Sequence, residues 1–180
     1  MSGGLESGGV LLADIGGTNA RFALWVADGQ GGGKIRKMHT LPTTGFATTE
    51  NALDELAAQI DLSGLKAALF AIAGPVSGEA ARLVNADWQF DLSALRSLLD
   101  VPLVKLINDF AAIGYAVPDL GEDMVRAIGP GGLHDRTKGP VLVIGPGTGL
   151  GLCIYVKDGD NDIVLPTEGG HATLTAFSAE

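Results

Sequence analysis

A carboxylate that could act as a base follows an apolar run in the middle of the chain. Asp109 comes directly after Asn108 and the run 102–107, which is typical of a buried strand. Ligand-binding groups of open α/β sheets lie beyond the carboxyl ends of such strands. Asp109 could therefore take a proton from a hydroxyl that attacks phosphorus, and Asn108 could bind neighbouring hydroxyls. Asp109 also precedes an expected helix over 110–117, so helix capping is an alternative role that can coexist with the first.

The first of two turns rich in glycine and threonine is Gly16-Gly17-Thr18, between two apolar runs. A strand on each side argues against a Rossmann loop, and the G-K-[ST] of a Walker A loop is absent. Such a hairpin can still direct several N–H groups and a hydroxyl at an anion. Asp14, before the turn, could hold Mg²⁺ through water, while Arg21 is either a surface charge or the partner of Asp14. A plain β-turn is the alternative for the turn itself.

The second turn, residues 145–151, contains four glycines and a threonine, which invites close approach of a ligand to the backbone. Two such turns together favour a divided phosphate site. Glu168 and His171, separated by two glycines, could bind vicinal hydroxyls. A zinc site is the alternative, but one Glu, one His and the distant Cys153 are too few ligands. Jointly these features indicate a kinase that acts on a small hydroxylated substrate.

Hydrophobic periodicity predicts the elements that position these groups. Strands are expected over 10–15, 22–27 and 34–41 as an antiparallel meander, followed by an amphipathic helix over 49–61 and a strand over 66–73. Further along we expect a strand over 80–86, a helix capped by Asp91 or Ser93, strands over 103–107, 141–144, 150–157 and 161–165, and the helix over 110–117.

The order of these elements suggests an α/β fold in which one architecture is used twice. The domain expectation is a flexible N-terminus over 1–9, a small α/β domain over 10–115, and the truncated beginning of a larger α/β domain over 116–180.

Composition restricts the classes of function. The 180 residues are 46% hydrophobic and 18% charged with a net charge of -9, so we expect a globular protein that does not bind nucleic acid over a broad surface. Cys153 is the only cysteine, which excludes an intrachain disulfide and predicts a small core residue. No secretory signal or membrane-spanning run is evident, so a cytoplasmic location is expected.

The motifs closely resemble those of bacterial glucokinase, in the order that family has them, and they span nearly the whole chain. They are Asp14 to Arg21, Asn85 ahead of Trp88, Ile107 to Phe110, Gly145 to Gly151, and Glu168 to His171. The resemblance implies the actin-like ATPase (ribonuclease H-like) fold, with a complete small domain and the start of a second, larger one. It also implies transfer of the ATP γ-phosphoryl group to the 6-hydroxyl of glucose, a step that feeds glycolysis.

The resemblance also assigns roles to individual residues. Asp109 would be the general base, with glucose hydroxyls contacted by Asn85, Asn108, Glu168 and His171. ATP phosphates would be held by Gly16, Gly17, Thr18 and Asn19 in the first turn and by Gly147, Thr148 and Gly149 in the second. Asp14 would lie near Mg²⁺ and hold it through water.

One departure from the family pattern is length, because glucokinases are nearly twice as long. The remaining part of the family carries the adenosine-binding segment and a further sugar-binding Glu. Exposed apolar surface would then favour oligomers, a homodimer among them. An inactive or incomplete fragment, a non-catalytic sugar-binding module and a structural ATPase of the same superfamily are the alternatives. Hexose selectivity and the phosphoryl donor stay open.

Overall fold

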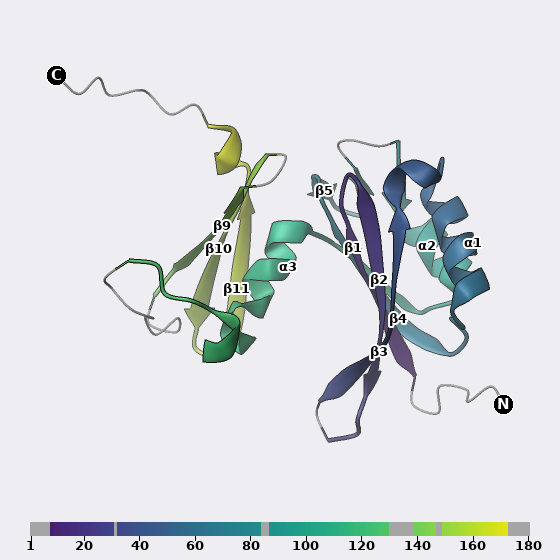
Figure 1. Ribbon diagram of the computed structural model, residues 1–180, viewed down its shortest axis with the longest axis horizontal. Helices are drawn as coiled ribbons and strands as arrows, with labels where there is room; N and C mark the ends of the chain where they lie inside the picture. The colour runs from purple at the N-terminus through teal and green to yellow at the C-terminus, as the bar shows by residue number, and fades with distance from the viewer. Residues whose placement is uncertain (1–7, 31, 84–86, 130–138, 147–148, 173–180) are drawn as a thin grey trace. The chain divides into compact units, whose positions relative to one another are not determined.

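The computed structural model describes residues 8–30, 32–83, 87–129, 139–146 and 149–172. The chain divides into two compact units, Met1–Asp109 and Phe110–Glu180, and each is described by itself (Figure 1). The sequence-based division was placed after residue 115, within the second of these units.

The first unit contains a five-stranded sheet of mixed direction. Strands β1 (Gly9–Ile15), β2 (Asn19–Ala27) and β3 (Gly33–Pro42) form the antiparallel meander predicted from the sequence. Strands β4 (Leu65–Ile72) and β8 (Leu103–Asn108) then join in parallel, giving the order β3-β2-β1-β4-β8. Parallel neighbours need a crossover, and helices α1 (Thr49–Gln59) and α2 (Leu92–Leu99) provide it.

The two helices lie together on one face of this sheet (Figure 1). Leu53 and Leu56 of α1 and Leu95 of α2 are buried there, against alternate residues of the strands such as Leu11 and Phe70. Each helix has a defined start. Thr48 accepts from the Asn51 N–H at 3.3 Å, and Asp91 accepts from the Ala94 N–H at 2.8 Å. Asp91, of the two candidates predicted, is therefore the cap of α2.

A small antiparallel sheet completes the first unit. It consists of β5 (Val76–Ser77), β6 (Ala80–Arg82) and β7 (Gln89–Asp91). Trp88 and Phe90 are both 1% exposed and belong to the core. The Trp88 indole donates to the carbonyl of Phe46 at 3.0 Å, which satisfies its one polar group. The strand predicted over 80–86 is observed over 80–82, and Asn85 lies outside the described residues.

The second unit repeats the meander of the first. Helix α3 (Asp109–Ala116) follows β8 directly, and the short 3-10 helices η2 (Val117–Asp119) and η3 (Glu122–Met124) come next. Strands β9 (Val141–Pro146), β10 (Leu150–Asp158) and β11 (Asn161–Thr167) pair antiparallel in the order β11-β10-β9. The 3-10 helix η4 (Gly169–His171) closes the described part.

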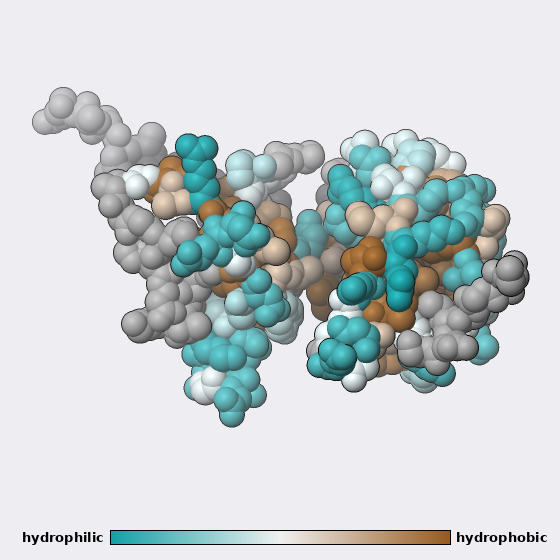
Figure 2. Space-filling view, turned by 60° about the horizontal axis from the view of Figure 1, so that its bottom comes forward, coloured by the Kyte–Doolittle hydropathy of each residue, from teal (hydrophilic) through white to brown (hydrophobic). Residues whose placement is uncertain are grey.

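The two faces of the second sheet differ. Cys153 and Tyr155 are fully buried, and Gly114 of α3 lies against Cys153 and Val164, so the helix covers this face closely. On the neighbouring strand β9 the residues of the other face are exposed, with Leu142 at 57% and Ile144 at 55%. Figure 2 shows hydrophobic residues reaching the molecular surface.

Candidate active site

Three parallel strands bring the predicted base and the first glycine turn to the same edge of the first sheet. In the register of the sheet, Ile15 of β1 lies opposite Ile72 of β4, which lies opposite Asn108 of β8. The chain therefore leaves β1 into Gly16 and leaves β8 into Asp109 at the same edge of the sheet, with the end of β4 between them. Ligands of open α/β sheets bind at this edge.

Hydrogen bonds from the loop after β4 connect these two strand ends. The Ala73 N–H donates to the carbonyl of Ile15 at 2.9 Å, and the Asn108 side-chain amide donates to the carbonyl of Gly74 at 3.3 Å. The loop is thus bonded to β1 on one side and to Asn108 on the other. Gly74 is a site neighbour that the sequence did not indicate, since its only signal was the Gly-Pro pair that ends the strand.

Asp109 is half-buried and is the first residue of α3. The helix predicted over 110–117 is observed over Asp109–Ala116. A carboxylate in the first turn of a helix is stabilised in its ionised form by the positive end of the helix dipole. The ionised form is the one that could take a proton, and a capping role can coexist with it.

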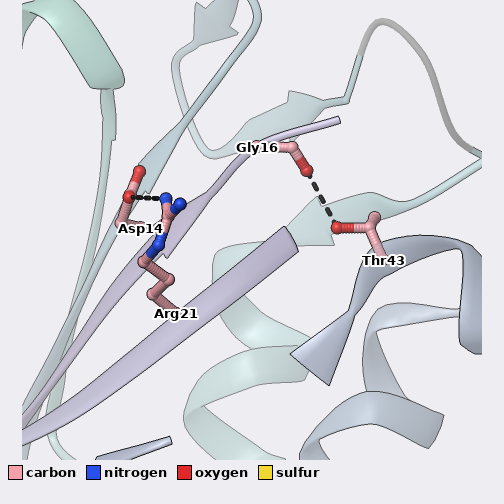
Figure 3. Close-up of polar contacts among 4 residues, drawn as sticks. All are labelled: Asp14, Gly16, Arg21 and Thr43. Atoms are coloured by element: carbon pink, nitrogen blue, oxygen red, sulfur yellow. Dashed lines mark hydrogen bonds and ion pairs between the residues drawn. The ribbon is translucent and has the colours of Figure 1, made fainter. Parts of the chain in front are cut away.

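The first glycine turn is fixed by its own backbone and by Thr43. The Gly16 N–H donates to the carbonyl of Asn19 at 2.9 Å, which closes the turn. The Thr43 hydroxyl donates to the carbonyl of Gly16 at 2.9 Å (Figure 3). The Thr43 N–H donates to the carbonyl of Thr18 at 2.9 Å. Thr43 was missed in the sequence, because a threonine at the end of an expected strand carries no signal of its own.

Asp14 and Arg21 form an ion pair beside the turn. They lie opposite each other in the β1–β2 register, and the Arg21 Nη1 is 3.0 Å from the Asp14 Oδ2 (Figure 3). The pairing of Arg21 with Asp14, one of the two alternatives, is therefore confirmed. Both side chains are more than half exposed, so the pair contributes at most about 1 kcal/mol to stability.

Two glycines of the second turn, Gly145 and Gly151, lie against a side chain of α3. A methyl group added at Gly145 would lie 2.7 Å from the Cζ of Phe110, and one added at Gly151 would collide with the same ring. These two glycines make room for Phe110 of α3. The phosphate assignment at this turn concerns Gly147, Thr148 and Gly149, and it stays a prediction. Gly149 faces open space, while Gly147 and Thr148 lie outside the described residues.

The segment from Glu168 to His171 lies against the start of β10. A methyl group at Gly170 would collide with the carbonyl of Leu150, and the Gly169 N–H donates to the Thr167 hydroxyl at 3.0 Å. The segment thus packs next to the second turn, which ends where β10 begins. Glu168 is exposed, and the side chain of His171 lies outside what the structure describes.

Cys153 behaves as the core residue that was predicted. It is fully buried, its thiol donates to the carbonyl of Phe110 at 3.0 Å, and burial raises its pKa. A raised pKa keeps the thiol protonated, which disfavours both metal binding and nucleophilic attack. Within the described ranges, no group of three or more His, Cys, Asp or Glu residues could hold a metal ion. In the same ranges, no helix is long and apolar enough to cross a membrane.

A comparison with known protein families shows which family this chain matches. The family model described as glucokinase matches residues 11–180. This chain belongs to the glucokinase family. The resemblance to glucokinase that the motifs indicated is therefore confirmed. The sheet edge that carries Gly16 and Asp109 belongs to a chain of this family.

The curated relatives of this glucokinase-family chain are longer than it is. A glucokinase from Nitrobacter hamburgensis is 44% identical over 166 residues, which are 91% of this chain and 49% of that protein. A glucokinase from Chromobacterium violaceum is 37% identical over 97% of this chain and 49% of its own length. The chain thus spans about half the length of the curated relatives it matches.

Solved structures confirm the predicted fold of this glucokinase-family chain. A glucokinase from an Antarctic psychrotroph superposes with a TM-score of 0.76 at 34% identity, covering 94% of this chain and 53% of that one. The chain therefore has the sugar-kinase form of the actin-like ATPase fold, in part.

Proposed function

We propose that this chain is the part of an ATP-dependent glucose kinase that carries the general base and both phosphate-binding turns. The observation that supports it most is the sheet edge of the first unit. There the first glycine turn follows β1 and the Asn108-Asp109 pair lies at the end of β8, two parallel strands on either side of β4, in a chain of the glucokinase family. A base beside a phosphate-binding turn is what phosphoryl transfer to a hydroxyl needs.

In this proposal Asp109 accepts the proton of the glucose 6-hydroxyl as that oxygen bonds to the γ-phosphorus of ATP. The bond between the γ-phosphorus and the bridging oxygen breaks, and ADP leaves with that oxygen. Asp109 lies in the first turn of α3, where the helix dipole favours negative charge. Most of the catalysis would come from alignment of the two substrates, because phosphoryl transfer demands little covalent chemistry from the protein.

Sugar recognition is assigned to Asn85, Asn108, Glu168 and His171. The Asn108 amide donates to the carbonyl of Gly74, which fixes the side chain at the sheet edge, and an amide can both donate to and accept from a sugar hydroxyl. Glu168 is exposed on a segment held against β10, so a sugar at the surface could reach its side chain. One structural neighbour supports the substrate class: a glucokinase from Balamuthia mandrillaris in complex with glucose shares the fold with a TM-score of 0.66 at 21% identity, over 97% of this chain and 51% of that one.

The ATP phosphates are assigned to Gly16, Gly17, Thr18 and Asn19 in the first turn and to Gly147, Thr148 and Gly149 in the second. Mg²⁺ fits the donor set beside the first turn. It prefers oxygen ligands, keeps several waters and needs only one or two carboxylates when phosphates supply the rest, and Asp14 is an exposed carboxylate at that place. When bound, the ion would neutralise charge on the transferred phosphate. Arg21 would remain near Asp14 and balance its charge.

The cellular setting follows from the same proposal. A kinase that consumes ATP and feeds glucose 6-phosphate to glycolysis would act in the cytoplasm. The exposed apolar residues of the second sheet, among them Leu142, Ile144 and Leu165, would favour association with further polypeptide, and a homodimer is one such assembly.

Glucose-dependent ADP production from MgATP tests the proposal. We would measure it for the 180-residue chain and for a chimera in which the chain replaces the matching half of the Nitrobacter hamburgensis glucokinase. The expected result is ADP production by the chimera that rises with glucose and stays at background without it. ADP production independent of glucose would instead indicate a structural ATPase. Glucose binding without ADP production would indicate a sugar-binding module.

A further inference from the structure

Thr43 is unusual among the polar residues of the chain. In the part of the chain that the structure describes, the buried polar residues are Thr43, at 0% exposed, and Thr49, at 2%. Each hydroxyl donates to a backbone carbonyl at 2.9 Å, from Thr43 to Gly16 and from Thr49 to Gln89. A buried hydroxyl is stabilising only when it is paired, so both threonines are fixed in place. They differ in the segment to which they are bonded.

Thr43 holds both ends of the first glycine turn. Its hydroxyl binds the carbonyl of Gly16, and its N–H binds the carbonyl of Thr18, both at 2.9 Å. A peptide group is planar and trans, so its N–H points opposite to its carbonyl. The carbonyl of Gly16 shares a peptide group with the N–H of Gly17, and that of Thr18 with the N–H of Asn19. Thr43 therefore turns both N–H groups away from itself.

The burial of the two sides of the turn agrees with this direction. Thr43 lies in the interior, whereas Gly17 and Asn19 are half-buried and Thr18 is exposed. The side of the turn opposite Thr43 is thus the side open to solvent. When N–H groups already point in the direction of the anion before it binds, binding costs little conformational entropy.

We infer that Thr43 is a positioning residue for the donor phosphates, because it holds the first turn with the Gly17 and Asn19 N–H groups directed at the phosphate chain. This inference rests on the proposed function, in which the turn binds ATP phosphates. Thr43 itself touches no phosphate. It acts through the carbonyls of the turn.

The test uses the 180-residue chain labelled with ¹⁵N and follows the amide signals of Gly16 to Asn19 during titration with MgATP. In the wild type these signals should shift in a saturable way, and inorganic tripolyphosphate with Mg²⁺ should shift the same signals. Thr43→Val keeps the shape and the backbone bond but removes the hydroxyl. We expect it to weaken the affinity reported by these amides about tenfold or more, since a buried carbonyl loses its partner. Thr43→Ser keeps the hydroxyl and should bind within about twofold of the wild type.

Thr49→Val is the matched control, because it removes an equally buried hydroxyl bond to a different carbonyl. It should lower the melting temperature much as Thr43→Val does and leave the affinity at the turn unchanged. Titrations are run at the same interval below each variant's own melting temperature, so that a difference in stability does not imitate a difference in binding.

The outcomes separate the inference from the proposed function. Wild-type affinity in Thr43→Val, equal losses in Thr49→Val, or a loss in Thr43→Ser like that in Thr43→Val would each overturn the role of Thr43. A wild-type chain whose turn amides respond to neither MgATP nor tripolyphosphate would overturn the phosphate role of the turn, and the inference with it.

Discussion

The two glycine-rich turns look alike in sequence and differ in what their glycines do. At the first turn, polar contacts decide the conformation, because Thr43 binds the carbonyls of Gly16 and Thr18. At the second turn, packing decides it, because Gly145 and Gly151 leave room for the ring of Phe110. Glycine can thus be needed in a turn so that a ligand can approach, so that a helix side chain fits, or so that the backbone can form a hydrogen bond. The surrounding structure shows which of these reasons applies.

The two turns occupy the same place in similar meanders, but different elements surround them. Both turns join the first two strands of an antiparallel meander. In the first unit the sheet continues through the parallel strands β4 and β8, whose ends supply Asn108 and the loop at Gly74. In the second unit the ring of Phe110 in α3 lies against Gly145 and Gly151, on the two strands that the turn joins.

The largest effect on stability is expected at the second turn. Gly151→Ala places a methyl group into the ring of Phe110, and we expect it to lower the free energy of unfolding by about 1–3 kcal/mol. Gly149→Ala is the matched control, since nothing lies within 4 Å of its added methyl group. Denaturant unfolding measures both. Combining Gly151→Ala with Phe110→Leu should recover part of the loss, and a double variant no more stable than Gly151→Ala would contradict the steric account.

A smaller effect is expected at the first turn. A methyl group at Gly16 would lie 3.4 Å from the carbonyl oxygen of Asn19, a contact that a slight shift relieves. We expect Gly16→Ala to lower the free energy of unfolding by less than about 1 kcal/mol. The same unfolding experiment compares the two turns directly. A loss at Gly16 as large as that at Gly151 would remove the distinction between them.

Arg21→Gln should have a still smaller effect. The pair with Asp14 is exposed on both sides, so we expect a loss of about 0.2–1 kcal/mol at low salt and less at high salt. Unfolding at two ionic strengths checks this. A loss that does not change with salt would mean that Arg21 contributes by packing and not by charge.

A further effect is expected at alkaline pH, from Tyr155 in the second unit. Its hydroxyl donates to Asp162 at 2.7 Å, and this bond, with burial and the nearby negative charges, raises the pKa of Tyr155 to about 12. Unfolded tyrosine loses its proton near pH 10, so the unfolded chain binds fewer protons between about pH 10 and 12. This contribution to stability is present below pH 10 and is lost as pH rises through that window. Tyr155→Phe should flatten this part of the unfolding profile, and an unchanged slope would contradict the assignment.

The elements were largely predictable, because each strand and helix carries its own period of apolar residues. The meander 10–41, the helix near 49–61 and the three strands after 141 all appear with small shifts at their ends. The cap of α2 was narrowed to Asp91 or Ser93 by residue type, and backbone geometry then selected Asp91.

What the sequence could not predict are contacts between residues far apart in the chain. Thr43 meets Gly16 and Phe110 meets Gly151 only after the sheets have formed. The burial of Trp88 depends on a hydrogen bond to Phe46 that no local pattern indicates. Such pairings are set by the register of strands, so single-sequence periodicity does not contain them.

The most direct test of the account is the turnover of Asp109→Asn in the chimera, beside Asp54→Asn as a control on the exposed face of α1. We expect Asp109→Asn to bind glucose as the unsubstituted chimera does and to lose glucose-dependent ADP production about a hundredfold or more, because the proton of the sugar hydroxyl has no acceptor. Asp54→Asn should keep full turnover. Undiminished turnover in Asp109→Asn would contradict the assignment of the general base.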